Sequence, residues 1–369
     1  MFYTIGIESD KSITTKRLSM GRMISAVVYE DIGKIAVKKL KLAECGPRDI
    51  ICESIYTFVS PGTELRVLGG DYSSPGDFPL IPGYSAVARV IERGAEVKGF
   101  RIGDLVSGRN PQPVPGIKSR WGGQASAHLY STTGEDRPVL LPEGARPLDY
   151  VIAEIAAISF RGVEAANPLA GESAIVIGQG LIGAFSAAWL MDRGCRVISC
   201  DVHEDRLRRA QERGVANTVN MSEPDAMERL AMICNGGADI VVESSGTSTG
   251  ALNAYKLIRK KPQAYGSEYK VEPISFYHND WPRLVMQANY VESISINPFS
   301  FMPGEGVSIL APKDRGVEDR QKVIEAIRTG RIRAKDFIDA ILPFDQAALG
   351  YEGLKNREYF SVAYQWLQC

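Results

Sequence analysis

The 369-residue sequence has few of the residues that build metal clusters or disulfide frameworks. It has six cysteines without a Cys-x-x-Cys pair, and three histidines that lie far apart. Structural zinc sites and small disulfide scaffolds need closely spaced ligands or cysteines, so the sequence predicts neither. Cys195 and Cys200 flank an apolar run, which is typical of reduced cysteines in a core.

The sequence also lacks an excess of charge of either sign. Lys and Arg number 43 against 44 Asp and Glu, for a net charge of −1. This balance disfavours a nucleic-acid or anionic-membrane partner. No apolar run has the length of a membrane span, and the N-terminal residues lack a signal-peptide core. We therefore expect a cytoplasmic protein that acts on a small molecule.

The most informative stretch is Ala174–Gly183, where a β-branched run enters a Gly-x-Gly-x-x-Gly turn and an apolar helix follows. Such glycines permit a tight turn, let the backbone approach a pyrophosphate, and let the helix pack closely on the strand. The free N–H groups of the helix start bind phosphate. We expect a dinucleotide to be held by Gly178, Gln179, Gly180, Leu181, Ile182 and Gly183.

An acid at the expected distance supports this interpretation. Asp201 ends a second predicted strand, where a carboxylate can bind both ribose hydroxyls and repel the 2′-phosphate of NADP. Arg206 is within reach, but we expect it on the helix that begins near Glu204. The predicted cofactor is NAD. A glycine turn in another α/β fold is the alternative.

The chain divides into two kinds of pattern. Short strands with Gly and Pro turns, one of them at Pro61-Gly62, run from Met23 to about Leu141, which indicates a mostly antiparallel β domain. A helix at Val151–Ala166 then leads into alternating strands and helices, which indicates a doubly wound parallel sheet. We expect its last strands at 262–266 and Val291–Ile296, followed by a tail with a helix at Val317–Thr329.

The fold class is therefore α/β. We expect an N-terminal extension at 1–22, a β-rich catalytic domain formed by 23–155 and 307–369, and a Rossmann NAD-binding domain at 156–306.

The chain resembles the medium-chain dehydrogenases/reductases over nearly its whole length. This resemblance implies a GroES-like catalytic domain, the Rossmann domain, and a homodimer or homotetramer in which Val291–Ile296 extends a sheet across two subunits. The branch it most resembles contains hydroxyethyl-bacteriochlorophyllide dehydrogenases and sugar- or cyclitol-alcohol dehydrogenases. The segments that carry the resemblance are Val59–Leu65, Ile81–Val90, Phe100–Val106, Gly122–Gly123, the glycine loop and Ile341–Ala347.

Members of this family with catalytic zinc have Cys, His, and a later Cys or acid at three positions. Here these positions align with Pro61, Tyr84 and Ala157. Proline and alanine offer no ligand, and a neutral phenol is a poor one. The resemblance therefore implies a zinc-independent member with no metal site.

The resemblance also suggests catalytic residues. Thr63 matches a hydroxyl at the substrate oxygen, or else it bonds its own turn. Tyr84 points where the metal lies in relatives, or fills a void in the core. Glu64 is catalytic, or it pairs with an arginine and holds the loop. His128 is catalytic or is an outward polar residue on a strand. Ser244, Ser245 and Gly246 are expected beside the cofactor ribose.

We therefore expect hydride transfer between NAD(H) and a secondary alcohol or ketone on a polyhydroxylated or bulky ring. Two alternatives remain at this stage. One is an enone or quinone reductase of the same superfamily, and the other is a non-catalytic NAD-binding protein.

Overall fold

The computed structural model describes residues 21–259, 281–295 and 306–367. Its N-terminal half builds two mostly antiparallel sheets around separate cores. The first sheet has the order β2-β1-β4-β7. Its strands are β1 (Met23–Asp31), β2 (Lys34–Lys41), β4 (Leu80–Ile81) and β7 (Lys118–Ser119).

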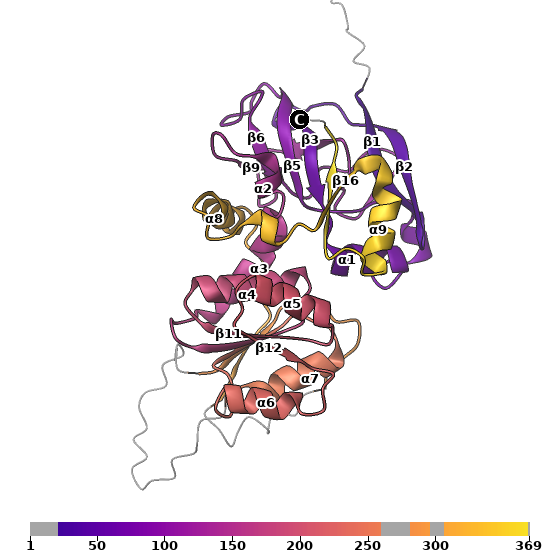
Figure 1. The fold of residues 1–369 in the computed structure, drawn as a ribbon. Helices are drawn as coiled ribbons and strands as arrows, with labels where there is room; N and C mark the ends of the chain where they lie inside the picture. The colour runs from indigo at the N-terminus through magenta and orange to yellow at the C-terminus, as the bar shows by residue number, and fades with distance from the viewer. Residues whose placement is uncertain (1–20, 260–280, 296–305, 368–369) are drawn as a thin grey trace, which may run out of the picture.

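The second sheet joins the two ends of the chain. It has the order β16-β17-β3-β5-β6-β9, with β8 paired to β3. In the antiparallel β17–β3 pair, Ala363 lies opposite Phe58, so the C-terminal tail completes the β-rich domain. Figure 1 shows the yellow tail beside the indigo strands. The strands are β3 (Asp49–Phe58), β5 (Ala86–Arg93), β6 (Leu105–Gly108), β8 (Ala127–Ser131), β9 (Val139–Leu140), β16 (Ala340–Pro343) and β17 (Val362–Gln365).

The second domain is a six-stranded parallel sheet of order β12-β11-β10-β13-β14-β15, whose reversal at β10 is that of a doubly wound fold. Helices α4 and α5 cover one face, and α6 and α7 cover the other (Figure 1). The predicted fold class is confirmed. The elements are β10 (Ser173–Ile177), α4 (Leu181–Asp192), β11 (Arg196–Asp201), α5 (Glu204–Glu212), β12 (Asn217–Asn220), α6 (Ala226–Ile233), β13 (Ile240–Glu243), α7 (Ser248–Leu257), β14 (Arg283–Met286) and β15 (Ser308–Leu310).

The helices α2 (Pro147–Tyr150), α3 (Ala153–Ala166) and α8 (Val317–Arg328) lie where the two domains meet, and α9 (Ala347–Lys355) packs on the β-rich domain (Figure 1). Short 3₁₀ turns occupy residues 75–77, 334–336 and 344–346. In the described ranges no helix combines the length and the apolar character that crossing a bilayer requires.

One predicted strand is wrong. Residues 291–295 form no strand, and the sheet is instead extended by β14 and β15. Leu284 and Val285 are fully buried in β14, whereas Val291 is 60% exposed. A strand inside a doubly wound sheet needs burial on both faces, which 291–295 do not have. We expected Val291–Ile296 to extend a sheet across two subunits. Residues 291–295 contain no strand that could do so. The predicted strand 262–266 and the loop at His278 lie outside the described residues.

A helix replaces the turn predicted at Pro61-Gly62. Helix α1 (Pro61–Gly69) begins there, with Ser60 at the N-cap and proline in the first turn, where its missing N–H is not needed. Glu64 Oε1 accepts a hydrogen bond of 2.8 Å from the Ser60 backbone N–H, which fixes the start of the helix. This helix carries Thr63 toward the second domain.

Candidate active site

The glycine loop joins β10 to α4 as its spacing predicts. Gly178 has a φ of +86°, which favours glycine. A Cβ on Gly183 would lie 1.7 Å from the Gly178 carbonyl oxygen, so only glycine fits there. A Cβ on Gly180 would meet nothing within 4 Å, so the loop faces open space at that residue. The start of α4 has no side-chain cap, which leaves its N–H groups for an anion.

Asp201 is the last residue of β11 and is 5% exposed. Its Oδ2 accepts a hydrogen bond of 2.6 Å from Gln179 N, and its Oδ1 accepts one of 3.0 Å from His203 N. Arg206 lies on α5 as expected, yet its guanidinium also reaches the carboxylate at 3.5 Å. The acid is thus fixed beside the glycine loop with a cation next to it.

These groups line a cleft of about 590 Å³ between the two domains. Ser244 Oγ, which lines this cleft, is buried without a hydrogen-bond partner in the described part of the chain. The open space at Gly180, the uncapped helix and this unpaired hydroxyl fit a dinucleotide. The predicted residues that line the cleft are Gly178, Gly180, Leu181, Ile182, Asp201, Ser244 and Ser245.

A second cavity of about 280 Å³ adjoins the cleft. The two share Gly62, Thr63, Arg66, Ile182, Ser244 and Ser245, so they lie side by side. The second cavity adds Tyr72, Tyr84, Arg109, Trp121 and Glu154, together with Gly246. Its lining combines hydroxyls, charges and aromatic faces, as in sites for small polar molecules.

Two of the predicted catalytic residues, Thr63 and Tyr84, meet in this second cavity. Tyr84 Oη donates a hydrogen bond of 2.6 Å to Ser60 Oγ. Burial raises the pKa of Tyr84 to about 12, while the hydroxyls of Ser60 and Thr63 lower it. The phenol therefore stays neutral at physiological pH and acts as a hydrogen-bond donor. These hydroxyls sit where the two cavities join.

Glu64 lies outside both cavities. Its Oε2 accepts hydrogen bonds from Tyr351 Oη and, at 3.3 Å, from Gln124 Nε2, and its Oε1 is bonded to Ser60 N. All of these bonds are internal and hold the loop, but the expected arginine partner is wrong, because tyrosine and glutamine take its place. Burial raises the pKa of Glu64 to about 7.

His128 is also placed away from the cavities. It is 2% exposed, so the outward position considered for it is wrong. Its ring nitrogens lie 3.2 Å from Ser54 Oγ and 3.0 Å from the Gly123 carbonyl oxygen. Burial lowers the pKa of His128 to about 4. A neutral histidine that joins β3 to the loop at Gly123 is a structural feature of this domain.

The residues at the family's metal positions do not fit a zinc ion. Pro61 has no ligand atom, and Tyr84 is held as a phenol. Ala157 has no ligand atom in its side chain, is 1% exposed in the core and lines neither cavity. Within residues 21–259, 281–295 and 306–367, no three His, Cys, Asp or Glu side chains are grouped to hold a metal ion.

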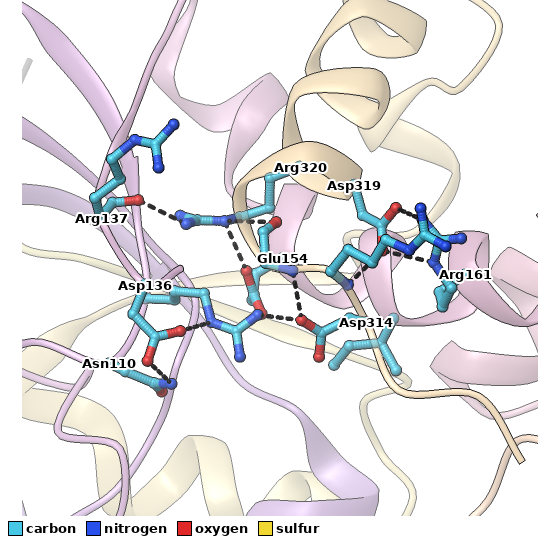
Figure 2. A network of polar contacts seen from close by, with 12 residues as sticks. Asn110, Asp136, Arg137, Glu154, Arg161, Asp314, Asp319 and Arg320 are labelled. Atoms are coloured by element: carbon cyan, nitrogen blue, oxygen red, sulfur yellow. Dashed lines mark hydrogen bonds and ion pairs between the residues drawn. The ribbon is translucent and has the colours of Figure 1, made fainter. Parts of the chain in front are cut away.

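Sequence reasoning missed a charged network at this cavity. Glu154, in the first turn of α3, lies 2.8 Å from Arg109 Nη1 and 3.4 Å from Arg320 Nε. Arg109 also contacts Asp314 at 2.6 Å and Asp136 at 2.9 Å. Figure 2 shows Glu154 between Arg320, Asp136 and Asp314. The signal in the sequence was this single acid in the middle of the otherwise apolar stretch Val151–Ala157.

Comparisons with known proteins agree with this geometry. Residues 182–264 match the family described as zinc-binding dehydrogenase. L-threonine 3-dehydrogenase from Yersinia pestis (strain Pestoides F) is 32% identical over 225 residues, which are 55% of this chain and 64% of that enzyme. The match thus spans slightly less than two thirds of the relative's length.

Solved structures share the fold at low identity. A putative zinc-binding dehydrogenase from Sinorhizobium meliloti 1021, bound to NADP, has a TM-score of 0.77 at 21% identity and covers 93% of this chain and 99% of its own. A short chain alcohol dehydrogenase from Escherichia coli CFT073, complexed with NADH, has a TM-score of 0.78 at 14% identity and covers 94% and 100%. Nicotinamide cofactors of both kinds thus occur on this fold.

Proposed function

Since this chain belongs to the medium-chain dehydrogenase/reductase superfamily, we propose that it is an NAD(H)-dependent, zinc-independent oxidoreductase. Its reaction interconverts a secondary alcohol and a ketone. The observation that carries the proposal is that the cleft at the glycine loop and the cavity at Thr63 and Tyr84 lie side by side and share lining residues. When bound, the cofactor supplies a nicotinamide ring that accepts or donates hydride.

The hydroxyls of Thr63 and Tyr84 are proposed to bind the substrate oxygen. An oxygen that gains negative charge needs donors within about 3 Å in a site shielded from water. Both side chains line the substrate cavity, and Tyr84 is 9% exposed. Glu64 and His128 lie outside the two cavities, so this proposal assigns them no chemistry.

The proposed substrate is a polyhydroxylated or bulky ring. Trp121 and Tyr72 offer aromatic faces, and Asn110 and Gln287 offer amide groups in the same cavity. Sugars and cyclitols have apolar ring faces and many hydroxyls, so a lining of this mixture suits them. The proposed branch of the superfamily, sugar- or cyclitol-alcohol dehydrogenases, is consistent with that lining.

NAD is proposed over NADP because of Asp201. A buried carboxylate at the ribose position favours two hydroxyls and disfavours a 2′-phosphate. Arg206, at 3.5 Å, is the feature that favours NADP, but it already pairs with that carboxylate. The balance therefore favours NAD.

The test is a turnover assay with NADH and two panels, one of aliphatic and cyclic ketones and one of enones and quinones. Oxidation of NADH with ketones alone supports the proposal. Turnover with enones or quinones alone would identify the enone or quinone reductase instead. Tight NADH binding by calorimetry without turnover on either panel would identify a non-catalytic NAD-binding protein.

A further inference from the structure

Glu154 is a buried acid at the wall of the substrate cavity. It is 1% exposed, and it shares the cavity with Thr63, Tyr84 and Trp121. Burying a carboxyl group costs free energy unless the group is paired. An incompletely paired carboxyl group in a cavity wall therefore indicates a function. Its position on the rigid helix α3 fixes it relative to the two hydroxyls.

The pairing of Glu154 is incomplete. Oε1 lies 2.8 Å from Arg109 Nη1, but Oε2 accepts no hydrogen bond in the described part of the chain and lies 3.4 Å from Arg320 Nε. Arg320 itself is committed elsewhere, because it donates to the carbonyl oxygens of Ser107 (3.1 Å) and Arg137 (2.7 Å). One carboxylate oxygen is therefore still able to accept a hydrogen bond.

The charges around Glu154 nearly balance. Burial raises the pKa of Glu154 to about 7, Arg109 and Arg320 lower it, and Asp314 and Asp136 raise it. The phenols of Tyr84 and Tyr130 also face it, and burial keeps both neutral. A group with this pKa exchanges its proton close to physiological pH, as a general acid–base catalyst must.

We propose that Glu154 is the acid–base group that takes the proton from the substrate hydroxyl and returns it in the reverse direction. This inference rests on the proposed function. In the oxidation direction the substrate C–H bond breaks and its electron pair leaves as hydride to the nicotinamide, which is reduced. The substrate O–H bond breaks, its proton bonds to Glu154, and the C=O bond forms. Thr63 donates a hydrogen bond to the same oxygen, and Tyr84 does so when its O–H turns from Ser60 Oγ to the bound substrate.

Two other buried titratable groups are less suited to be the acid–base group. Glu64 has a similar pKa, but its oxygens are occupied by Ser60, Tyr351 and Gln124 and it lines neither cavity. His128 is neutral above about pH 4 and is bonded within the β-rich domain. Glu154 combines access to the cavity, a free oxygen and a suitable pKa.

The test compares wild-type enzyme with Glu154→Gln and with Asp136→Asn as a matched control. Asp136 contacts the same arginine but is half exposed and lines neither cavity. Turnover is measured from pH 5 to 9 with NAD⁺ and cyclohexanol or myo-inositol, and with NADH and cyclohexanone. Wild-type oxidation should rise with pH through about 7, and reduction should fall there.

Glu154→Gln should lose turnover by about 10²- to 10⁴-fold and lose this pH dependence. Asp136→Asn should stay within about fivefold of wild type, because Asp136 is half exposed, is screened by solvent and has the smallest effect on the pKa of Glu154 among the charged groups around it. Infrared difference spectra of the cofactor-free proteins give a second readout. Protonated carboxyl bands that titrate near pH 7 should come from Glu154 and Glu64, and each should disappear in the matching glutamine variant.

Each failure has its own meaning. If wild type turns over and Glu154→Gln keeps the same rate and pH profile, the role of Glu154 is wrong and the proposed function stands. If the infrared band near pH 7 is unchanged in Glu154→Gln, Glu154 does not titrate there and the inference is overturned. If wild type turns over none of these alcohols or ketones, the proposed function falls and the inference falls with it.

Discussion

Tyr84 Oη donates a hydrogen bond of 2.6 Å to Ser60 Oγ, across the junction between the substrate cavity and the cofactor cleft. This bond joins Tyr84, which the resemblance matches to a metal-binding histidine, to the N-cap of the helix that carries Thr63. It fixes the orientation of the phenol without a metal ion.

The first prediction concerns these hydroxyls. Thr63→Val and Tyr84→Phe should each lower turnover on the order of a hundredfold, because each removes one donor to the charged oxygen. NADH affinity should hardly change, since the altered atoms stabilise charge only during the reaction. Steady-state kinetics and fluorescence titration with NADH measure the two effects.

Tyr130→Phe is the matched control for these variants. Tyr130 is buried and lines neither cavity, and its hydroxyl has no hydrogen-bond partner in the described part of the chain. This variant should turn over like wild type. If Thr63→Val and Tyr84→Phe do so as well, neither hydroxyl takes part in the chemistry.

The second prediction concerns zinc. The purified protein should contain no stoichiometric zinc, and a chelator should leave its activity unchanged, because Pro61 offers no ligand and one oxygen of Glu154 is bound by Arg109. Elemental analysis of the purified chain measures the metal. One tightly held zinc per chain, with activity lost on its removal, is the result that contradicts this.

The third prediction concerns cofactor choice. Wild type should bind NADH more tightly than NADPH, and Asp201→Ser combined with Val202→Arg should relax or invert that preference. The change should amount to about 1–3 kcal/mol, the usual effect of a gained or lost polar contact. Titrations with both cofactors measure it. Tighter binding of NADPH by wild type would show that Arg206 outweighs Asp201.

The fourth prediction separates two glycines of the same loop. Gly183→Ala should destabilise the fold by about 1–3 kcal/mol or more, because its Cβ would overlap the Gly178 carbonyl. Gly180→Ala should keep the melting temperature but weaken NADH binding, because its Cβ would enter only the open space of the cleft. Calorimetry gives both quantities. Equal stability of the two variants contradicts the packing assigned to Gly183.

The fifth prediction is a pH dependence of stability from Glu64. Its pKa is raised from 4.5 to about 7 in the folded protein by burial. The contribution of Glu64 to the free energy of unfolding is full below pH 4.5 and is lost as pH rises through 7. The reason is that the folded state keeps a proton that the unfolded state releases. Between pH 5 and 8 the loss is roughly 2 kcal/mol.

Glu64→Gln has no carboxyl group to titrate at this position. The unfolding free energy of the variant minus that of wild type should therefore increase from pH 5 to pH 8. Urea unfolding at the two pH values measures that shift. Glu154 adds a change of the same sign and His128 one of the opposite sign, and both are common to the two proteins. A gap that is constant with pH contradicts the raised pKa.

The sequence by itself determined the α/β fold class and the glycine loop between β10 and α4. Both depend on short-range patterns: a β-branched run, three glycines at fixed spacing and an acid at the end of the next strand. Three residues of one β-α-β unit act through local backbone geometry: Gly178, Gly183 and Asp201. Their structural roles can therefore be predicted without the rest of the chain.

Only the tertiary structure decided which side chains surround the substrate cavity. Glu154, Arg109 and Asp314 come from three separate segments and meet because α3, the end of β6 and the start of α8 pack together. Glu64 stands next to Thr63 in sequence yet faces the core, where Tyr351 binds it. The role of a charged residue depends on its burial and on partners that are distant in the chain. The sequence pattern alone does not contain that information.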